Sequence, residues 1–261
     1  MSNDPGTRHG EIRTEARDGV GWVTIARPQK RNALTVAMWT AIPAAMQSLS
    51  EREDLVAIFL QGADGNFGAG ADLEDVARAG ESRSLADDYC GDVVRALLAI
   101  ATVPLPTVAL VQGVAAGGGA ELAIACDVRL AEPTASFSFP FARLGIVPDA
   151  FTLARLKDLV GASTARRLVF TGETVDASRA HDLGLVDEVT RTDPGALLAA
   201  AESWAATLRT GSRSARREMK RVLMEPEARL DVGVLTTPMV ESFVAGEVRA
   251  AALRFLAKRS P

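Results

Sequence analysis

The alternation of apolar and polar positions predicts that the chain begins with a pair of β-strands. Residues 11–17 and 20–26 are strand-like runs on either side of Asp18-Gly19, a dipeptide typical of a tight hairpin turn. We therefore expect a β-hairpin at this point. Residues 1–10 carry no such pattern and are expected to form a flexible tail.

A helix and a buried strand are expected after the hairpin. Apolar side chains recur at helical spacing after Thr35, which can cap a helix that runs to about Glu53. Pro43 lies inside this segment and predicts a kink. Residues 55–60 are almost all apolar, which favours a strand covered on both faces.

Two glycine-rich segments interrupt this pattern. Residues 62–72 (GADGNFGAGAD) follow the first buried strand, and residues 112–122 (QGVAAGGGAEL) follow a second one at 107–111. The second segment opens a helix that ends near Ala125. Because N–H groups at a helix N-terminus point outward and carry partial positive charge, such loops can bind a ligand oxygen. Tight packing is the alternative reason for the glycines.

The remaining pattern completes an α/β fold. Further elements are expected as a helix at 85–102 and strands at 127–131, 136–139 and 185–189. Helical patterns dominate after Thr152. We expect a strand-rich core over residues 11–195 and a helical C-terminal segment over residues 196–261.

Composition and charge narrow the class of protein. With 48% apolar and 24% charged residues in 261, the chain is typical of a globular protein with one large domain. A net charge of −4 provides no positive field for nucleic acid or anionic lipid, so neither partner is expected. Cys90 and Cys126 are too few for a disulfide framework.

The sequence gives no sign of export or membrane insertion. The first ten residues lack an apolar signal core, and the longest apolar stretch, residues 93–111, is interrupted by Arg95 and two prolines. We expect a soluble, cytoplasmic protein.

Several familiar catalytic sites are excluded by their missing residues. Neither glycine segment contains a phosphate-binding G-x-x-x-x-G-K-[ST] motif, and the chain has no G-x-S-x-G. Only His9 and His181 could serve a histidine metal site or a serine triad, so no metal is expected. The remaining possibility is that each glycine loop offers one N–H to the same oxygen, as in an oxyanion hole. Glu121 follows the second loop and could alternatively complement the helix dipole.

Seven short segments carry a family resemblance. The first glycine loop reads F-x-A-G-A-D at 67–72. The second loop, at 112–122, matches the pattern N-G-x-x-x-G-G-G-x-E-L except that Gln112 stands in place of the asparagine. The other segments are 27–34 (RPQKRNAL), 126–127 (CD), 144–148 (LGIVP), 180–186 (AHDLGLV) and 255–259 (FLAKR). Together, and in this order, they resemble the enoyl-CoA hydratase/isomerase (crotonase) superfamily.

The resemblance implies a fold, a substrate class and an assembly. The expected fold is a spiral of β-β-α units, and helices in the C-terminal segment 196–261 would hold a trimer or a dimer of trimers together. The substrate would be a coenzyme A thioester, with no separate cofactor. The N–H groups of Ala69 and Gly118 would bind the thioester oxygen, which becomes negative when water adds or a proton leaves beside it. Each such donor is worth about 3–4 kcal/mol.

The same resemblance assigns residues to coenzyme A. The coenzyme A portion of the substrate would lie along two stretches, 29–31 and 69–73, with basic side chains near its phosphates. The expected coenzyme A and substrate residues are Gln29, Lys30, Arg31, Gly70, Ala71, Asp72, Leu73, Phe141, Lys258 and Arg259. For the basic residues, a solvated surface is the alternative.

The acid and base residues depart from the hydratase pattern. Glu121 matches the first of two family glutamates, which activates water, but Phe141 stands in place of the second. Asp149 stands where hydratases have glycine, and in this it resembles the aspartate of isomerase and dehalogenase branches. We expect Glu121 and Asp149 to act as a pair beside an apolar Phe141 wall, which would raise a carboxyl pKa. The alternative for Asp149 is an N-cap of a helix that starts near Phe151.

Three functions follow from this reading. Hydration of a 2-enoyl-CoA has the broadest motif support. Isomerisation of an enoyl-CoA double bond, including one in a ring-derived acyl group, needs only one carboxylate and could use Asp149. A catalytically weak acyl-CoA binder is the third hypothesis, motivated by Phe141.

Overall fold

The structure is a computed structural model that describes residues 10–224 of the 261 in the chain. The chain divides into two compact units between Arg209 and Thr210. Both sheets belong to the first unit, whereas helix α9 (Arg213–Met224) belongs to the second. Residues 1–9 and 225–261 lie outside the described residues. They include nine of the ten residues of the expected tail and the candidate residues Lys258 and Arg259, so the expected domain boundaries stay predictions.

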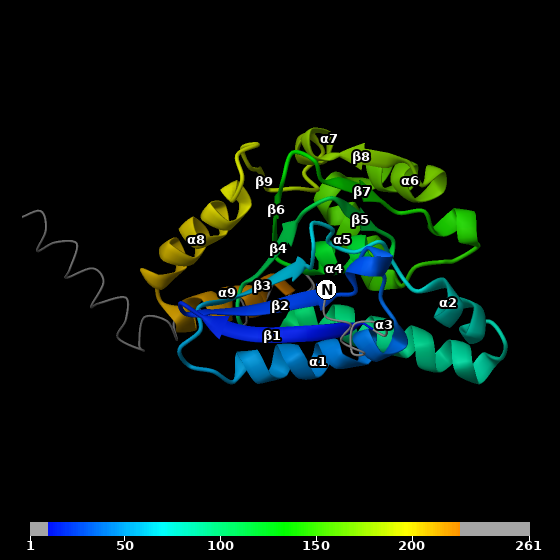
Figure 1. Ribbon diagram of the computed structural model, residues 1–261, viewed down its shortest axis with the longest axis horizontal. Helices are drawn as coiled ribbons and strands as arrows, with labels where there is room; N and C mark the ends of the chain where they lie inside the picture. Colours follow the sequence, from blue (N-terminus) through cyan, green and yellow to red (C-terminus); the bar gives the residue numbers. More distant parts are fainter. Residues whose placement is uncertain (1–9, 225–261) are drawn as a thin grey trace, which may run out of the picture. The chain divides into compact units, whose positions relative to one another are not determined.

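A six-stranded sheet forms the centre of the first unit (Figure 1). Its order is β1-β2-β3-β4-β6-β9, and β1 alone runs antiparallel to its neighbour. The strands are β1 (Glu11–Arg17), β2 (Val20–Ala26), β3 (Ala57–Gly62), β4 (Thr107–Val111), β6 (Val128–Ala131) and β9 (Glu188–Val189). The predicted hairpin is confirmed, with Asp18 and Gly19 both at positive φ in its turn.

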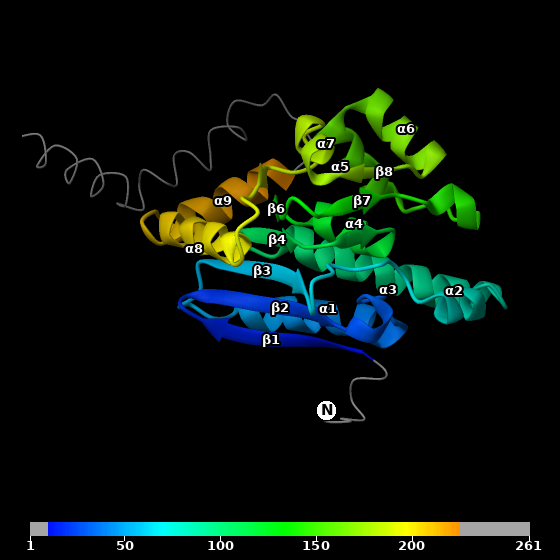
Figure 2. The same cartoon turned by 45° about the horizontal axis from the view of Figure 1, so that its top comes forward.

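Both faces of this sheet are covered. On one face, Ile58 and Leu60 of β3 pack in a cluster with side chains of α1 (Val36–Ser50) and α3 (Arg83–Thr102). On the other face, Phe59 packs in a second cluster with α8 (Ala196–Arg209). Figure 2 shows α8 and α1 on different sides of the strands. Because β3 is buried on both faces, its unbroken apolar run is explained.

Two successive β-β-α units build a smaller sheet beside the first. In the first β-β-α unit, β4 is followed by β5 (Val114–Ala116), which belongs to the smaller sheet, and then by helix α4. In the second, β6 is followed by β7 (Ser136–Ser138), which pairs with β5, and later by helix α5. Strand β8 (Thr174–Asp176) completes the smaller sheet in the order β5-β7-β8. The remaining helices are α2 (Leu73–Ala79), α4 (Gly118–Ala125), α5 (Ala150–Val160), α6 (Ala162–Thr171) and α7 (Ala177–Asp182), with short 3₁₀ turns η2 (Pro28–Lys30) and η3 (Phe141–Leu144).

Some expected elements are shorter or differ in kind. The strand expected at 185–189 is reduced to β9, because the N–H groups of Leu185 and Val186 both donate to Ala180 O and close a turn. Helix α1 ends at Ser50 and continues on both sides of Pro43. In the part of the chain that the structure describes, no helix combines the length and apolar character needed to cross a membrane.

The two glycine segments are hydrogen-bonded to each other. They follow β3 and β4, which are parallel neighbours, so both leave the sheet at the same edge. Gly68 donates to Val114 O and accepts from Ala116 N, both at 2.9 Å. A Cβ on Gly119 would lie 2.0 Å from Gly68 O. Close packing therefore requires glycine at position 119, and the two loops meet at this point.

Asn32 ties the segment before α1 to the first glycine loop. Its side chain is fully buried, accepts from the Arg27 N–H at 2.9 Å, and donates to Ala63 O at 2.7 Å and Asn66 O at 2.6 Å. Its φ of +59° lies in the left-handed region, which asparagine tolerates better than most residues. One side chain thus satisfies three backbone groups.

We expect N32A to lower the free energy of unfolding by about 2–4 kcal/mol, because three buried backbone groups lose their partner. Urea denaturation measures this loss. The control is S48A on the exposed side of α1, for which a change below about 0.5 kcal/mol is expected. Equal effects of the two substitutions would show that the Asn32 contacts do not hold the loop.

Candidate active site

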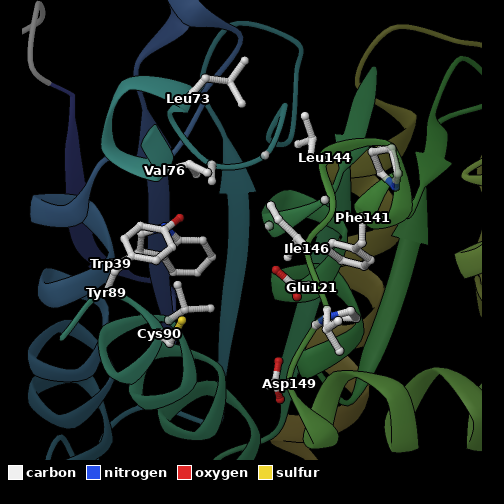
Figure 3. A pocket seen from close by; sticks show the side chains of 18 of the residues that line it. Trp39, Leu73, Val76, Tyr89, Cys90, Glu121, Phe141, Leu144, Ile146 and Asp149 are labelled. Atoms are coloured by element: carbon white, nitrogen blue, oxygen red, sulfur yellow. The ribbon is translucent and has the colours of Figure 1, made fainter. Parts of the chain in front are cut away.

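A cavity of about 420 Å³ opens beside the junction of the two glycine loops. Backbone of residues 69–71 and 117–118 lines it, together with side chains of α2, α3, η3 and the segment that leads into α5. Figure 3 shows Trp39 and Tyr89 on one wall, and Glu121 and Phe141 on the other. The sequence-predicted acids Glu121 and Asp149 both line this one cavity.

Ala69 does not supply the donor that was expected of it. Its N–H donates to Arg31 O at 2.9 Å, inside the protein, and is therefore not available to a ligand. This corrects the assignment of Ala69 to an oxyanion hole. The residue still lines the cavity.

The N–H of Ala71, two residues later, has the opposite orientation. Leu34 donates to Gly70 O at 2.7 Å and accepts from Asp72 N at 2.8 Å, which makes a parallel bridge to Ala71. In such a bridge the residue between the two bonded residues, here Ala71, has its N–H and C=O directed away from the partner segment. No hydrogen bond within the described residues uses the Ala71 N–H, and Ala71 lines the cavity.

Gly118 offers a second free N–H close by. It is the first residue of α4, so its N–H has no carbonyl four residues earlier in the helix. A Cβ on Gly118 would lie 3.5 Å from Ala71 N, and bond lengths then place the two nitrogens within about 6 Å of each other. Two donors at that spacing can share one oxygen acceptor at normal hydrogen-bond length.

An indole ring packs directly against this donor pair. A Cβ on Gly118 would lie 2.7 Å from Cζ2 of Trp39, so only glycine fits between the indole and the loop. Trp39 comes from α1 and is 1% exposed. The position of the Gly118 N–H therefore depends on a side chain from a distant helix.

Glu121 is a carboxyl group that burial keeps neutral. It lies on the first turn of α4 and is 6% exposed. Burial, and after it the charge of Asp149, raises its pKa to about 8, although a hydrogen bond from Thr152 partly offsets this. The Thr152 Oγ1 to Glu121 Oε1 distance is 3.5 Å. At neutral pH, Glu121 therefore mostly holds a proton.

Asp149 is held by Thr152 through both of its carboxylate oxygens. It caps α5, accepting from Thr152 N at 3.0 Å and from Thr152 Oγ1 at 2.7 Å. The helix-cap reading of Asp149 is confirmed, with α5 starting at Ala150. Because Asp149 also lines the cavity, the cap does not exclude a chemical role. Thr152 is fully buried and lies between the two acids.

Apart from Asp72, the described residues that are expected to bind coenzyme A fall into two places. Gln29, Lys30 and Arg31 are exposed, in and just after the turn η2. Gly70 and Ala71 line the cavity, as do the 62%-exposed Leu73 and the buried Phe141. Nothing in the structure tests contact with coenzyme A, so these assignments stay predictions.

Asp72 already has partners within the protein. It caps α2 and pairs with Arg27 at 2.5 Å. Burial opposes its charge, but the Arg27 hydrogen bond and the amides of Asp75 and Glu74 outweigh burial and lower its pKa. Its carboxylate fastens the first loop to the preceding segment.

Sequence reasoning missed Thr152, Trp39 and Tyr89. Thr152 stands three residues after an expected cap, a spacing that can signal a capping contact. The aromatic residues come from helices that meet only in the folded chain, and no local motif marks them. Their place in the cavity required the packing of α1 against α3.

We expect E121Q to stabilise the protein at alkaline pH but much less at acidic pH. A pKa raised from 4.5 to about 8 means that folding stability is lost as pH rises between these values, by on the order of a few kcal/mol. Glutamine removes this loss. Melting temperatures at pH 5 and pH 9 measure it, with E202Q on exposed α8 as control. A gain that is the same at both pH values would contradict the buried, neutral Glu121.

Known proteins share both the sequence and the fold. Residues 15–261 match the sequence profile of the family described as enoyl-CoA hydratase/isomerase. A probable enoyl-CoA hydratase of Mycobacterium leprae is 34% identical over 257 residues, covering 97% of this chain and 98% of that one. An enoyl-CoA hydratase/isomerase family protein from Hyphomonas neptunium superimposes with a TM-score of 0.89 at 29% identity, over 95% of both chains. An enoyl-CoA hydratase from Bacillus anthracis gives 0.85 at 27% identity, over 96% of this chain and 97% of that one. These matches confirm the expected crotonase-like α/β fold, and the chain belongs to the enoyl-CoA hydratase/isomerase family.

Proposed function

We propose that the protein is an enoyl-CoA hydratase that adds water to a 2-enoyl-CoA thioester. The observation that carries this proposal is the pair of acids in one cavity, one holding a proton and one accepting hydrogen bonds through both oxygens. Hydration needs one group that takes a proton and one that gives a proton. In this proposal Glu121 gives the proton and Asp149 takes one.

The thioester oxygen would bind between the N–H groups of Ala71 and Gly118. Both amides lie at the cavity, and their spacing allows a shared acceptor. The oxygen becomes negative as the new bond forms at C3, so fixed donors stabilise the transition state more than the substrate. Ala71 replaces Ala69 in this role because the Ala69 N–H is already bonded.

The addition balances with the two carboxyl groups alone. Asp149 takes a proton from water while the water oxygen bonds to C3, and the double-bond electrons move towards the thioester oxygen. Glu121 then gives its proton to C2 as the enolate collapses. Asp149 ends protonated and Glu121 ionised. Thr152 Oγ1, at 2.7 Å from one acid and 3.5 Å from the other, can pass the proton back.

Isomerisation is the second candidate, and Phe141 favours it. Phe141 is buried in the cavity wall, and the sequence resemblance aligns it with the second glutamate of the hydratase pattern. An isomerase moves one proton between carbons and needs no water. A 3-enoyl-CoA converted to a 2-enoyl-CoA faster than the latter is hydrated would favour this alternative.

We expect purified protein to convert crotonyl-CoA to 3-hydroxybutyryl-CoA, followed by loss of absorbance of the conjugated thioester. E121Q and D149N should each lower kcat by about 100- to 10,000-fold, because each removes one proton-transfer group. E202Q, on the exposed face of α8, serves as the control and should retain activity. Stabilisation by coenzyme A esters without any turnover would instead identify a binding protein. Full activity of D149N would contradict the paired acids.

We expect the wild-type rate to fall as pH rises through about 8, because Glu121 then loses the proton that it must donate. The pH profile of kcat measures this directly. D149N should keep an alkaline limb in its residual activity, moved to lower pH because the charge of Asp149 no longer raises the pKa of Glu121, whereas E121Q should lose the limb. An alkaline limb that persists in E121Q would assign the proton to another group.

A further inference from the structure

Two hydrogen-bond donors on the wall opposite the acids have no part in the proposed chemistry. The indole N–H of Trp39 is buried, so a ligand in the cavity does not reach it directly, and it acts as a hydrogen-bond donor towards Tyr89. It lies next to the Tyr89 phenol, another lining group of the cavity. With the indole N–H turned towards the phenol oxygen, the phenol O–H is the donor that an acceptor in the cavity can reach.

The rest of this wall is apolar. Val76 of α2 and Val93 and Val94 of α3 line the cavity beside Tyr89. Figure 3 shows Tyr89 and Trp39 together, with Glu121 on the far side of the space where an acyl group would lie. A polar spot in an otherwise apolar wall fixes the orientation of a ligand and selects its chemistry.

The spot is suited to an uncharged oxygen. Burial raises the pKa of the Tyr89 phenol, and the nearby acidic groups of Glu121 and Asp75 raise it further, which outweighs the lowering by the Trp39 hydrogen bond, so the phenol remains a neutral donor. None of the described residues that line the cavity is a lysine, arginine or histidine, whereas two are acids. A carboxylate on the acyl group would therefore be buried beside acidic groups without a compensating cation.

We propose that Trp39 and Tyr89 form a subsite for a neutral oxygen substituent of the acyl group, a keto, hydroxyl or ether oxygen. The phenol O–H would donate to this oxygen, and the indole N–H would hold the phenol in place by donating to it. The inference rests on the proposed function, because it places the acyl group between this wall and Glu121. It names the substrate class as oxygenated enoyl-CoA thioesters.

The test compares 2-hexenoyl-CoA with two analogues of the same chain that carry a hydroxyl or a keto oxygen near the end distant from the thioester. Y89F removes one donor while it keeps the ring, and V76A removes apolar wall without touching a donor. In wild type we expect a higher kcat/KM for an oxygenated substrate than for the plain one. Y89F should lower that ratio at least about tenfold, and V76A should leave the ratio unchanged. An unchanged ratio in Y89F would overturn the subsite, as when a bound water alone satisfies the donors.

A binding measurement separates this inference from the proposed function. Calorimetry with hexanoyl-CoA and its hydroxyl and keto analogues requires no turnover. If the wild type converts none of the enoyl substrates but prefers the oxygenated thioesters, and Y89F loses this preference, the proposed hydratase function fails and the subsite stands. If the wild type hydrates crotonyl-CoA but binds all the hexanoyl thioesters equally, the subsite fails and the function stands.

Discussion

The hydrogen-bonded junction between the two glycine loops is the contact on which the site depends. Gly68 bonds to both ends of the segment 114–116, and Gly119 packs against it so closely that no side chain fits. This junction sets the distance between Ala71 N and Gly118 N. Because donors fixed before the reaction need no reorganisation as charge develops, the rigidity of the junction has a direct chemical value.

The two carboxyl groups of the cavity, those of Glu121 and Asp149, lie in different surroundings. Glu121 lies within a helix that is buried on every side, and burial disfavours its charged form. Asp149 lies at the start of a helix, where Thr152 supplies an amide and a hydroxyl donor. The fold thus places a buried carboxyl group and a helix-capping carboxyl group in one cavity whose described lining has no lysine, arginine or histidine.

The sequence is informative where a signal is local. Asp18-Gly19 marks the hairpin, the apolar run of β3 marks a doubly covered strand, and the loops after β3 and β4 mark the site. The choice between Ala69 and Ala71 is not local in this sense. In extended backbone, N–H groups two residues apart point the same way, but Gly70 between them has a φ of +108° and breaks this pattern. The Arg31 contact of Ala69 and the bridge to Leu34 therefore decide which N–H faces the cavity.

Other features escape sequence reasoning because they are short or depend on distant contacts. Strands β5 and β8 have three residues each, too few to show a period. Helix α2 begins at Leu73, straight after the glycine segment, and its cap Asp72 looks like part of the loop. The wall formed by Trp39 and Tyr89 exists only once α1 and α3 pack together.

The contact between the Trp39 indole and Gly118 links two properties that are usually tuned separately. The same ring supports the backbone that would hold the reacting oxygen and forms part of the wall that an acyl group would touch. A smaller side chain at position 39 would enlarge the cavity and would also weaken the packing that holds the Gly118 N–H in place. Adaptation to bulkier substrates is therefore constrained at position 39. Side chains of α2 and η3 line the same cavity from other elements, so acyl preference has more freedom to change there.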